Sequence, residues 1–230
     1  MHLSDRLRRI AANVKSRGVV ADIGCDHGFT SIYLVQQHLA DGAVAMDINE
    51  DPLKRAKEHI LQYQMQDKIS LRLSDGAKGL AVGEADTILI SGMGGALICR
   101  ILRDGGAAVR SASELVLSPQ SEAWLVRHCI HEMGFRIAAE EMVAEQGKYY
   151  VIIRAVPGTE SYGQEVDYIY GRRLAEDRDK VFLEFLQKER ERVSRALEGM
   201  EGKELCAGSA ERKQELLQMR KMIESILEIG

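Results

Sequence analysis

The sequence has no long apolar run: no stretch of its 230 residues approaches the roughly 20 apolar residues that a helix needs to cross a bilayer. No apolar core follows the charges of residues 1–18, so we expect neither a signal peptide nor a membrane anchor. A net charge of −4 excludes a uniformly basic nucleic-acid binder, although a local basic face would suffice to meet phosphates. The cysteines include no C-x-x-C pair, which favours reduced thiols and a cytoplasmic location; they are Cys25, Cys99, Cys129 and Cys206.

Two common phosphate-binding motifs are also missing. A Walker loop needs Gly-Lys followed by Ser or Thr, and this triplet occurs nowhere. The stretch VVADIGCDHGFTSIYL, residues 19–34, contains a glycine-bracketed turn, but the dinucleotide spacing G-x-G-x-x-G counted from Gly24 meets Asp26 and Phe29 where glycines are required. A carboxylate would repel a pyrophosphate, so this turn does not suit a dinucleotide.

Short apolar runs do alternate with amphipathic segments over the first two thirds of the chain. Ser4 is placed to cap a first helix, and Pro52 suits the first turn of a later one. Two runs that follow one another directly around Gln146 and Gly147 predict an antiparallel edge. The predicted parallel strands begin at Val19, Ala43, Ile69, Ala85 and Glu114. This pattern predicts an α/β fold, a doubly wound Rossmann-like sheet with helices on both faces, over residues 1–156.

A second domain is predicted over residues 157–230, after the turn-rich joint PGTESYG. Its composition shifts toward charged and helix-forming residues, with two helical stripes of apolar side chains. The stripes are Val166, Ile169, Tyr170, Leu174, Val181, Phe185, Val193 and Leu197, and then Leu216, Met219, Ile223 and Ile226. Two antiparallel helices, a helical hairpin or coiled coil, fit this spacing best.

Acidic residues stand at the ends of three successive predicted strands. Asp22 precedes Gly24, Asp47 follows Gly28 by 19 residues, and Asp75 ends the next strand. The turn resembles the first motif of class I S-adenosylmethionine-dependent methyltransferases, whose cofactor carries a sulfonium and an ammonium but no phosphate, so that acids help its binding. An acid after the second strand suits the ribose hydroxyls. We assign to the cofactor Asp22, Gly24, Gly28, Asp47, Ile48, Asp75, Gly76, Ser91 and Gly92.

A closer resemblance rests on several short segments together. HLSDRL, DIGCDHG, DIN, SDG, ISGMGG and LSPQ, followed by a helical extension, are similar to the bacterial tRNA adenine-22 N-1 methyltransferase family (TrmK) over residues 2–155. One departure is LSPQ, where a Gln-Pro-Asn-like segment is expected and Ser118 and Gln120 stand instead. The resemblance implies methyl transfer to ring nitrogen 1 of an adenine in tRNA, with tRNA as the partner and a monomer or weak dimer as the enzyme.

In that reaction the product ring becomes cationic, and a carboxylate beside the ring would stabilise the developing charge. Asp26 is the leading catalytic candidate, with His27 to orient it, while the alternative for Asp26 is a structural helix cap. We assign to the substrate Arg6, Phe29, Met93 and Gln120. An exposed first-helix arginine is the alternative for Arg6. Tyr33 and Tyr149 are further stacking candidates.

Other chemistry is weakly supported. His128, Cys129 and His131 share a helix, but no second ligand cluster accompanies them, so we expect no metal and surface positions for all three. Trp124 is expected to be buried. Three alternatives stay open: a methyltransferase of this fold acting on a small molecule, one acting on another RNA nitrogen, and a non-catalytic RNA-binding factor. The helical extension favours a macromolecular substrate, and the strand-end acids favour a bound cofactor.

Overall fold

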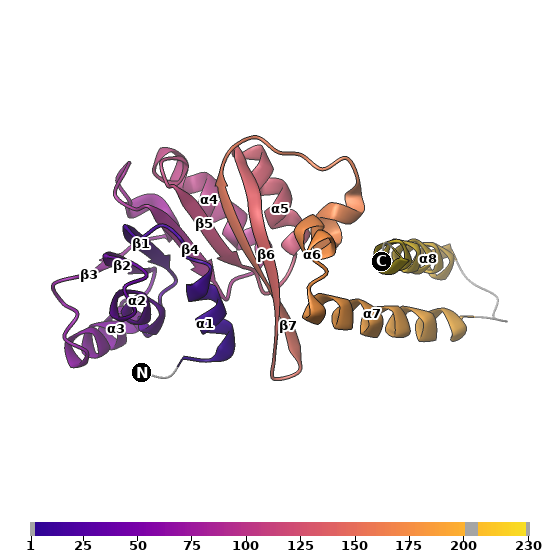
Figure 1. Cartoon of the computed structure of the whole chain (residues 1–230), viewed down its shortest axis with the longest axis horizontal. Coiled ribbons are helices and arrows are strands. Elements are labelled where there is room, and N and C mark those ends of the chain that lie inside the picture. The colour runs from indigo at the N-terminus through magenta and orange to yellow at the C-terminus, as the bar shows by residue number, and fades with distance from the viewer. Residues whose placement is uncertain (1–2, 201–206, 229–230) are drawn as a thin grey trace. The chain divides into compact units, whose positions relative to one another are not determined.

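A seven-stranded sheet forms the centre of the first of two units in the computed structural model, which describes residues 3–200 and 207–228 (Figure 1). The strand order is β3-β2-β1-β4-β5-β7-β6. Five strands are parallel: β1 (Val19–Ile23), β2 (Gly42–Asp47), β3 (Ile69–Leu73), β4 (Thr87–Ser91) and β5 (Glu114–Ser118). The hairpin of β6 (Phe135–Glu145) and β7 (Lys148–Pro157) adds an antiparallel edge. The predicted fold class is therefore confirmed.

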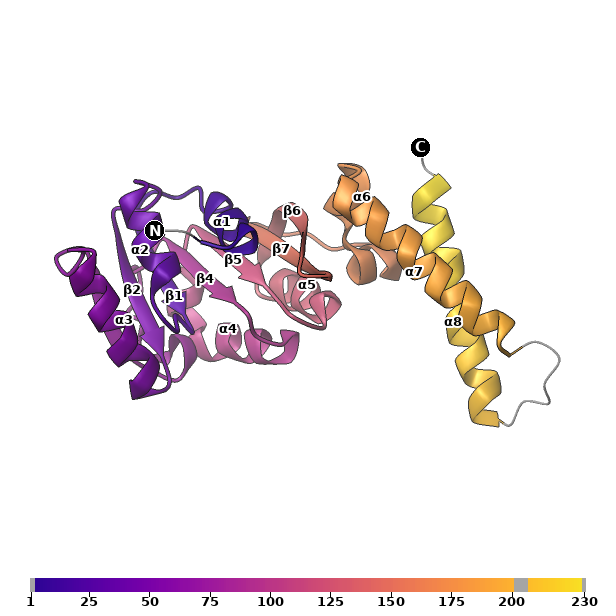
Figure 2. The ribbon, with the colours of Figure 1, turned by 90° about the horizontal axis from the view of Figure 1, so that it is seen from below.

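Helices cover both faces of this sheet because its central strands are apolar on both sides (Figure 2). Ile88 and Ile90 of β4 join the cluster that α4 and α5 close, whereas Leu89 points into the cluster under α1 and α2. α3 and α2 pack over β2 and β3. The helices are α1 (Asp5–Ala12), α2 (Phe29–Gln36), α3 (Glu50–Gln62), the short 3-10 turn η1 (Gly76–Gly79), α4 (Gly95–Arg110) and α5 (Ala123–Glu132).

α1 is tied to strands that lie far along the chain. The Ser4 hydroxyl accepts the Leu7 amide, so the predicted cap is confirmed. Arg9 and Asn13 both contact the Glu141 carboxylate of β6. These contacts span more than 120 residues of sequence and fix α1 beside the antiparallel edge.

The first compact unit runs to Arg173, whereas the sheet ends near the expected boundary at residue 156. The intervening segment folds back on α5 and contains the π-helical turn η2 (Asp167–Gly171). Buried Arg127 of α5 holds it: Nη1 donates to the Tyr168 carbonyl at 2.7 Å, and Nε donates to Glu140 at 2.7 Å. α6 (Arg172–Glu176) follows.

The second unit, residues 174–230, contains α7 (Lys180–Glu198) and α8 (Ala207–Glu228), which pack together and run in opposite directions (Figure 2). Asp179 caps α7 by accepting the Phe182 amide. The buried side chains of α7 and α8 are Phe182, Leu186, Val193, Leu197, Leu216, Ile223 and Ile226. Five residues of the predicted stripes are only half-buried: Val166, Ile169, Val181, Phe185 and Met219. A coiled coil stays a prediction.

Across the part of the chain that the structure describes, no helix is both long and apolar enough to cross a membrane.

Candidate functional site

Two adjoining hollows open at the carboxyl ends of the parallel strands, where α/β sheets commonly bind ligands. The first, of about 290 Å³, lies between α1 and the turn after β1. The second, of about 360 Å³, is lined by the turns after β1, β2, β3 and β4 and by the start of α4. Gly24, Asp26, Ser91 and Gly92 line both. The strand order thus brings together residues that lie far apart in the sequence.

The turn after β1 needs its two glycines for different reasons. Gly24 has a φ of +78°, and a Cβ there would lie 2.2 Å from the Cε atom of Met93. Gly28 has a φ of +71°, starts α2, and lies against Ala56 of α3. Gly24 lines both hollows, whereas Gly28 lines neither. Gly28 therefore shapes the turn, and Gly24 leaves room in the site.

Asp22 brings a buried carboxylate to the first hollow. The residue is 4% exposed, and its carboxylate accepts a hydrogen bond from the Ser31 hydroxyl at 2.7 Å. Burial raises the pKa of Asp22 to about 6, and the bonds from Ser31 offset part of this rise. Near neutral pH the group is therefore a poorly solvated anion that a cation would stabilise.

The second hollow combines two carboxylates with apolar walls. Asp47 accepts the Asn49 amide at 2.9 Å, and Asp75 lies 2.6 Å from Lys78. The hydrogen bond from Lys78 and its charge lower the pKa of Asp75. Ile48, 59% exposed, and Leu97, 38% exposed, supply the apolar surface. Carboxylates that accept from hydroxyls beside exposed apolar walls suit a nucleoside better than a phosphate.

Asp26 lies where the two hollows meet. It is a non-glycine residue with a φ of +47°, and its exposed carboxylate lies 3.2 Å from the Arg55 guanidinium and 3.5 Å from Nε2 of His27. The N-cap of α2 is Gly28, with no side-chain hydrogen bond to the helix. The structural-cap alternative for Asp26 is therefore wrong.

Phe29 is the stacking candidate that lines the first hollow, while Tyr33 and Tyr149 line neither. Its ring stacks on His59 of α3 with centroids 4.3 Å apart. No motif pointed to His59, whose Nδ1 atom lies 2.9 Å from the carbonyl oxygen of His27. The rings of Phe29 and His59 thus stack on each other beside the first hollow.

The remaining substrate candidates lie at the same edge. Met93 lines the second hollow, and the backbone N–H of Gln120 donates to the Met93 carbonyl at 2.9 Å. Gln120 lines neither hollow, but its Nε2 atom would lie 3.7 Å from a Cβ added to Gly92. Arg6 lines the first hollow with a side chain only 18% exposed, so the exposed-arginine alternative is wrong.

The structure adds lining residues that the motifs did not indicate. Leu97, Arg100 and Ile101 come from the first two turns of α4 and face the second hollow. The i, i+4 spacing of Leu97 and Ile101 directly after the GMGG loop is the signal that could have found them. Cys25 and Thr30 also line the first hollow, and burial raises the pKa of the Cys25 thiol, which disfavours a nucleophilic role.

Two expectations on α5 are wrong. Trp124 is 44% exposed, because it lies off the buried stripe of this helix. Cys129 is buried, and the His131 side chain is only 5% exposed, with Nδ1 3.0 Å from the Tyr168 hydroxyl. His128 is half-buried. Within residues 3–200 and 207–228, no three His, Cys, Asp or Glu side chains are grouped to hold a metal ion. Cys206 lies outside the described residues.

Comparison with known proteins identifies the family of this chain. Residues 3–153 match the family model described as a methyltransferase domain. The tRNA (adenine(22)-N(1))-methyltransferase of Bacillus subtilis is 30% identical over 234 aligned residues, covering 100% of this chain and 97% of that protein.

Two crystal structures extend the likeness to three dimensions. B. subtilis TrmK, a tRNA m1A22 methyltransferase, superimposes with a TM-score of 0.87 at 28% identity over 99% of each chain. Sp1610 from Streptococcus pneumoniae, in complex with S-adenosyl-L-methionine, gives a TM-score of 0.87 at 28% identity, over 99% of this chain and 100% of that one. On these grounds the chain belongs to the tRNA (adenine(22)-N(1))-methyltransferase family.

Proposed function

We propose that this protein transfers a methyl group from S-adenosylmethionine to ring nitrogen 1 of adenine 22 in tRNA. The observation that carries the proposal is the row of carboxylates Asp22, Asp47 and Asp75 at the ends of three neighbouring strands. They occur in a chain that matches the B. subtilis enzyme along its full length.

The second hollow is the proposed site for the nucleoside portion of the cofactor. Asp47 accepts hydrogen bonds from the ribose hydroxyls, Asp75 accepts from the adenine amino group, and Ile48 packs on the flat ring. S-adenosylmethionine supplies a methyl group activated by its sulfonium charge. Asp22 faces the cationic methionine end across the Gly24 turn. The proposed cofactor residues are Asp22, Gly24, Gly28, Asp47, Ile48, Asp75, Gly76, Ser91 and Gly92.

The acceptor adenine enters from the first hollow in this proposal. Ring nitrogen 1 already holds an in-plane lone pair, so no base is needed: the N–C bond forms as the S–C bond breaks, and the ring becomes cationic. The Asp26 carboxylate stabilises that charge, and His27, 3.5 Å away, orients it. Phe29 stacks on the base, while Met93 and Gln120 contact its edge.

A paired adenine hides nitrogen 1, so the target base has to leave its stack. The enzyme therefore also has to bind the tRNA outside the pocket, and we assign this binding to the helices of the C-terminal part, residues 157–230. Arg173 is a poor test of that role, because it lies 2.8 Å from Glu160 and donates to the Ile137 carbonyl. With tRNA as its substrate, the enzyme acts in the cytoplasm, as a monomer or weak dimer.

Labelled methyl transfer to an unmodified tRNA transcript tests the function. We expect N1-methyladenosine from the wild type and none from a transcript with guanine at position 22. Asp26→Asn is expected to lower kcat about 10- to 100-fold, at the low end for a charge-stabilising group because Arg55 partly neutralises Asp26. A different methylated nucleoside refutes the assignment. No transfer to any tRNA, with the cofactor bound, favours a small-molecule substrate.

A further inference from the structure

The first hollow presents a problem of charge. The methionine end of S-adenosylmethionine carries a carboxylate as well as an ammonium, yet Asp22 and Asp26 both line this hollow. They suit the ammonium and repel the carboxylate. Among the residues that line the hollow, the permanent cation is Arg6 of α1.

The Arg6 side chain is largely shielded from solvent, and two of its donor atoms lack a hydrogen-bond partner. Its side chain is 18% exposed, and both Nε and Nη1 are shielded from solvent without a hydrogen-bond partner. The nearest carboxylate oxygen, on Glu145, lies 3.9 Å from Nε, too far for a hydrogen bond. Shielded donors on a charged group carry a desolvation cost that a bound acceptor would recover. The guanidinium therefore has two donors available to bind an anionic group.

The hairpin of β6 and β7 holds Arg6 in this state. The Arg6 amide donates to Glu145 at 3.1 Å, and the guanidinium carbon lies 4.8 Å from the centre of the Tyr150 ring. Other arginines near the site differ: Arg55 and Arg100 are largely exposed, and Arg55 already lies 3.2 Å from the Asp26 carboxylate. Arg6 alone combines burial, open donors and a place in the first hollow among these three.

We propose that Arg6 binds the carboxylate of the methionine portion of S-adenosylmethionine; this inference rests on the proposed function. The first hollow shares Gly24 with the cofactor turn and contains Asp22, the proposed partner of the ammonium. A guanidinium offers two parallel donors that match a carboxylate. A phosphate of the RNA backbone has the same donor preference, but it would have to reach a side chain that is mostly buried.

The test compares two ligands that differ at the amino-acid end. S-adenosylhomocysteine carries the carboxylate, and 5′-methylthioadenosine lacks the amino-acid group entirely. Equilibrium binding of each is measured with wild type, Arg6→Gln and Arg6→Lys. We expect Arg6→Gln to weaken S-adenosylhomocysteine roughly 10- to 100-fold, as for a lost charged hydrogen bond, and methylthioadenosine less than about 3-fold. Arg6→Lys, which keeps the charge, is expected to fall between.

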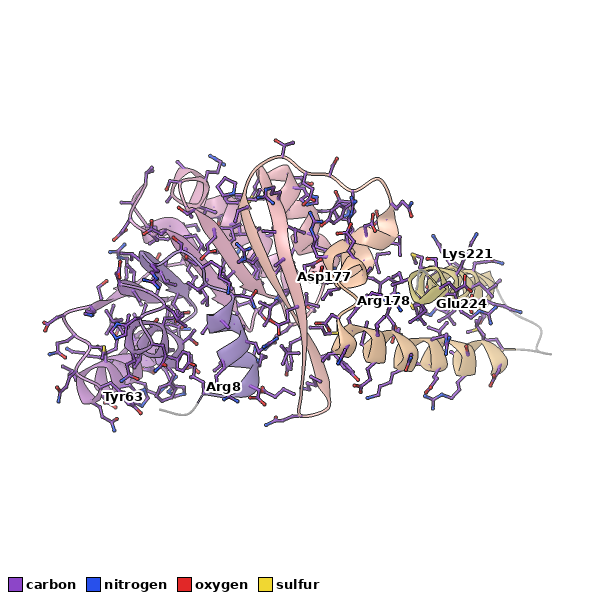
Figure 3. The ribbon with its side chains drawn as sticks, in the orientation of Figure 1. Arg8, Tyr63, Asp177, Arg178, Lys221 and Glu224 are labelled. Atoms are coloured by element: carbon purple, nitrogen blue, oxygen red, sulfur yellow. The ribbon has the colours of Figure 1, made fainter. Side chains whose placement is uncertain are left out.

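Arg8→Gln is the matched control. Arg8 lies on the same helix but at the surface, where it pairs with Asp5 (Figure 3). We expect it to leave the binding of both ligands unchanged. Thermal melting without ligand shows that each variant folds.

Two results would overturn the proposal. Equal weakening of the two ligands would make Arg6 a structural residue of the turn. Unchanged S-adenosylhomocysteine affinity together with weaker binding of tRNA, measured without cofactor, would assign Arg6 to an RNA phosphate. All these readouts are affinities, so a protein that methylates a different substrate still yields a clear answer for Arg6.

Discussion

Replacing Asp22 with Asn should make the protein more stable and bind its cofactor less well. The pKa of Asp22 is about 6 in the folded protein against an ordinary value of 3.8, a rise of about 2. At about 1.4 kcal/mol per pKa unit, the ionised carboxylate costs the folded state about 3 kcal/mol. Asn keeps an acceptor for the Ser31 hydroxyl and carries no charge.

The raised pKa of Asp22 determines the pH range over which its effect on stability changes. Between the unfolded and the folded pKa, the native state holds more protons than the unfolded state, so wild-type stability falls as pH rises from about 4 to about 6. Above this window the full cost is present, and below it the cost vanishes. The stability gained by Asp22→Asn should therefore be near zero at pH 4 and largest from pH 7 upward.

Thermal melting across pH 4–8 measures this directly. For a chain of this size, 3 kcal/mol corresponds to a rise in Tm of about 6–12 °C at pH 7. Asp22→Asn should also weaken the binding of S-adenosylhomocysteine, because the ammonium of this ligand would lose its proposed partner. Wild-type binding near pH 6 should release protons, seen by calorimetry in two buffers. A Tm difference that does not vary with pH, or a less stable variant at pH 7, would refute the reasoning.

Other substitutions test the turn, a buried ion pair and the C-terminal helices. Gly24→Ala should abolish cofactor binding and lower the free energy of unfolding by at least about 1–2 kcal/mol. Gly83→Ala is the control, because Gly83 has a similar φ of +75° but open space around it. In urea denaturation Gly83→Ala should show only the cost of placing an alanine at a positive φ. Glu140→Gln should lower the free energy of unfolding by about 3 kcal/mol, because it leaves the buried charge of Arg127 without a partner. Glu132→Gln, in the exposed pair with Arg103, should lower it by less than about 1 kcal/mol. Equal losses of stability would contradict this reasoning. Reversing the exposed charges of Arg190 and Arg195 should lower tRNA affinity and flatten its salt dependence in filter binding; no change would place RNA contacts elsewhere.

The fold and the edge of the sheet that carries the candidate site could be predicted because both depend on local patterns. Apolar runs separated by amphipathic segments specify a parallel sheet, and the carboxyl ends of its strands must meet at one edge. Asp22, Asp47 and Asp75 are therefore placed by topology alone. The two glycines likewise indicated a turn after the first strand, and the structure adds that both Gly24 and Gly28 have positive φ values.

The remaining errors concern contacts between distant segments. The sequence pattern predicts Arg6 to be a surface residue of an amphipathic helix. Its shielding depends on contacts with Glu145 and Tyr150, which lie about 140 residues later in the sequence. His131 was expected at the surface because nothing in α5 shows that Tyr162 and Tyr168 fold over it. The pKa of Asp22 depends on burial by neighbouring elements in the same way. Such properties belong to the packed molecule and have no local signal.

The dependence of α1 on the antiparallel hairpin has a consequence for synthesis on the ribosome. The first helix emerges early, but Glu141, Glu145 and Tyr150, which hold it, are translated about 130 residues later. Contacts of such long sequence separation form late. We therefore expect a nascent chain to complete the second hollow, the proposed nucleoside site, before Arg6 is held at the first hollow.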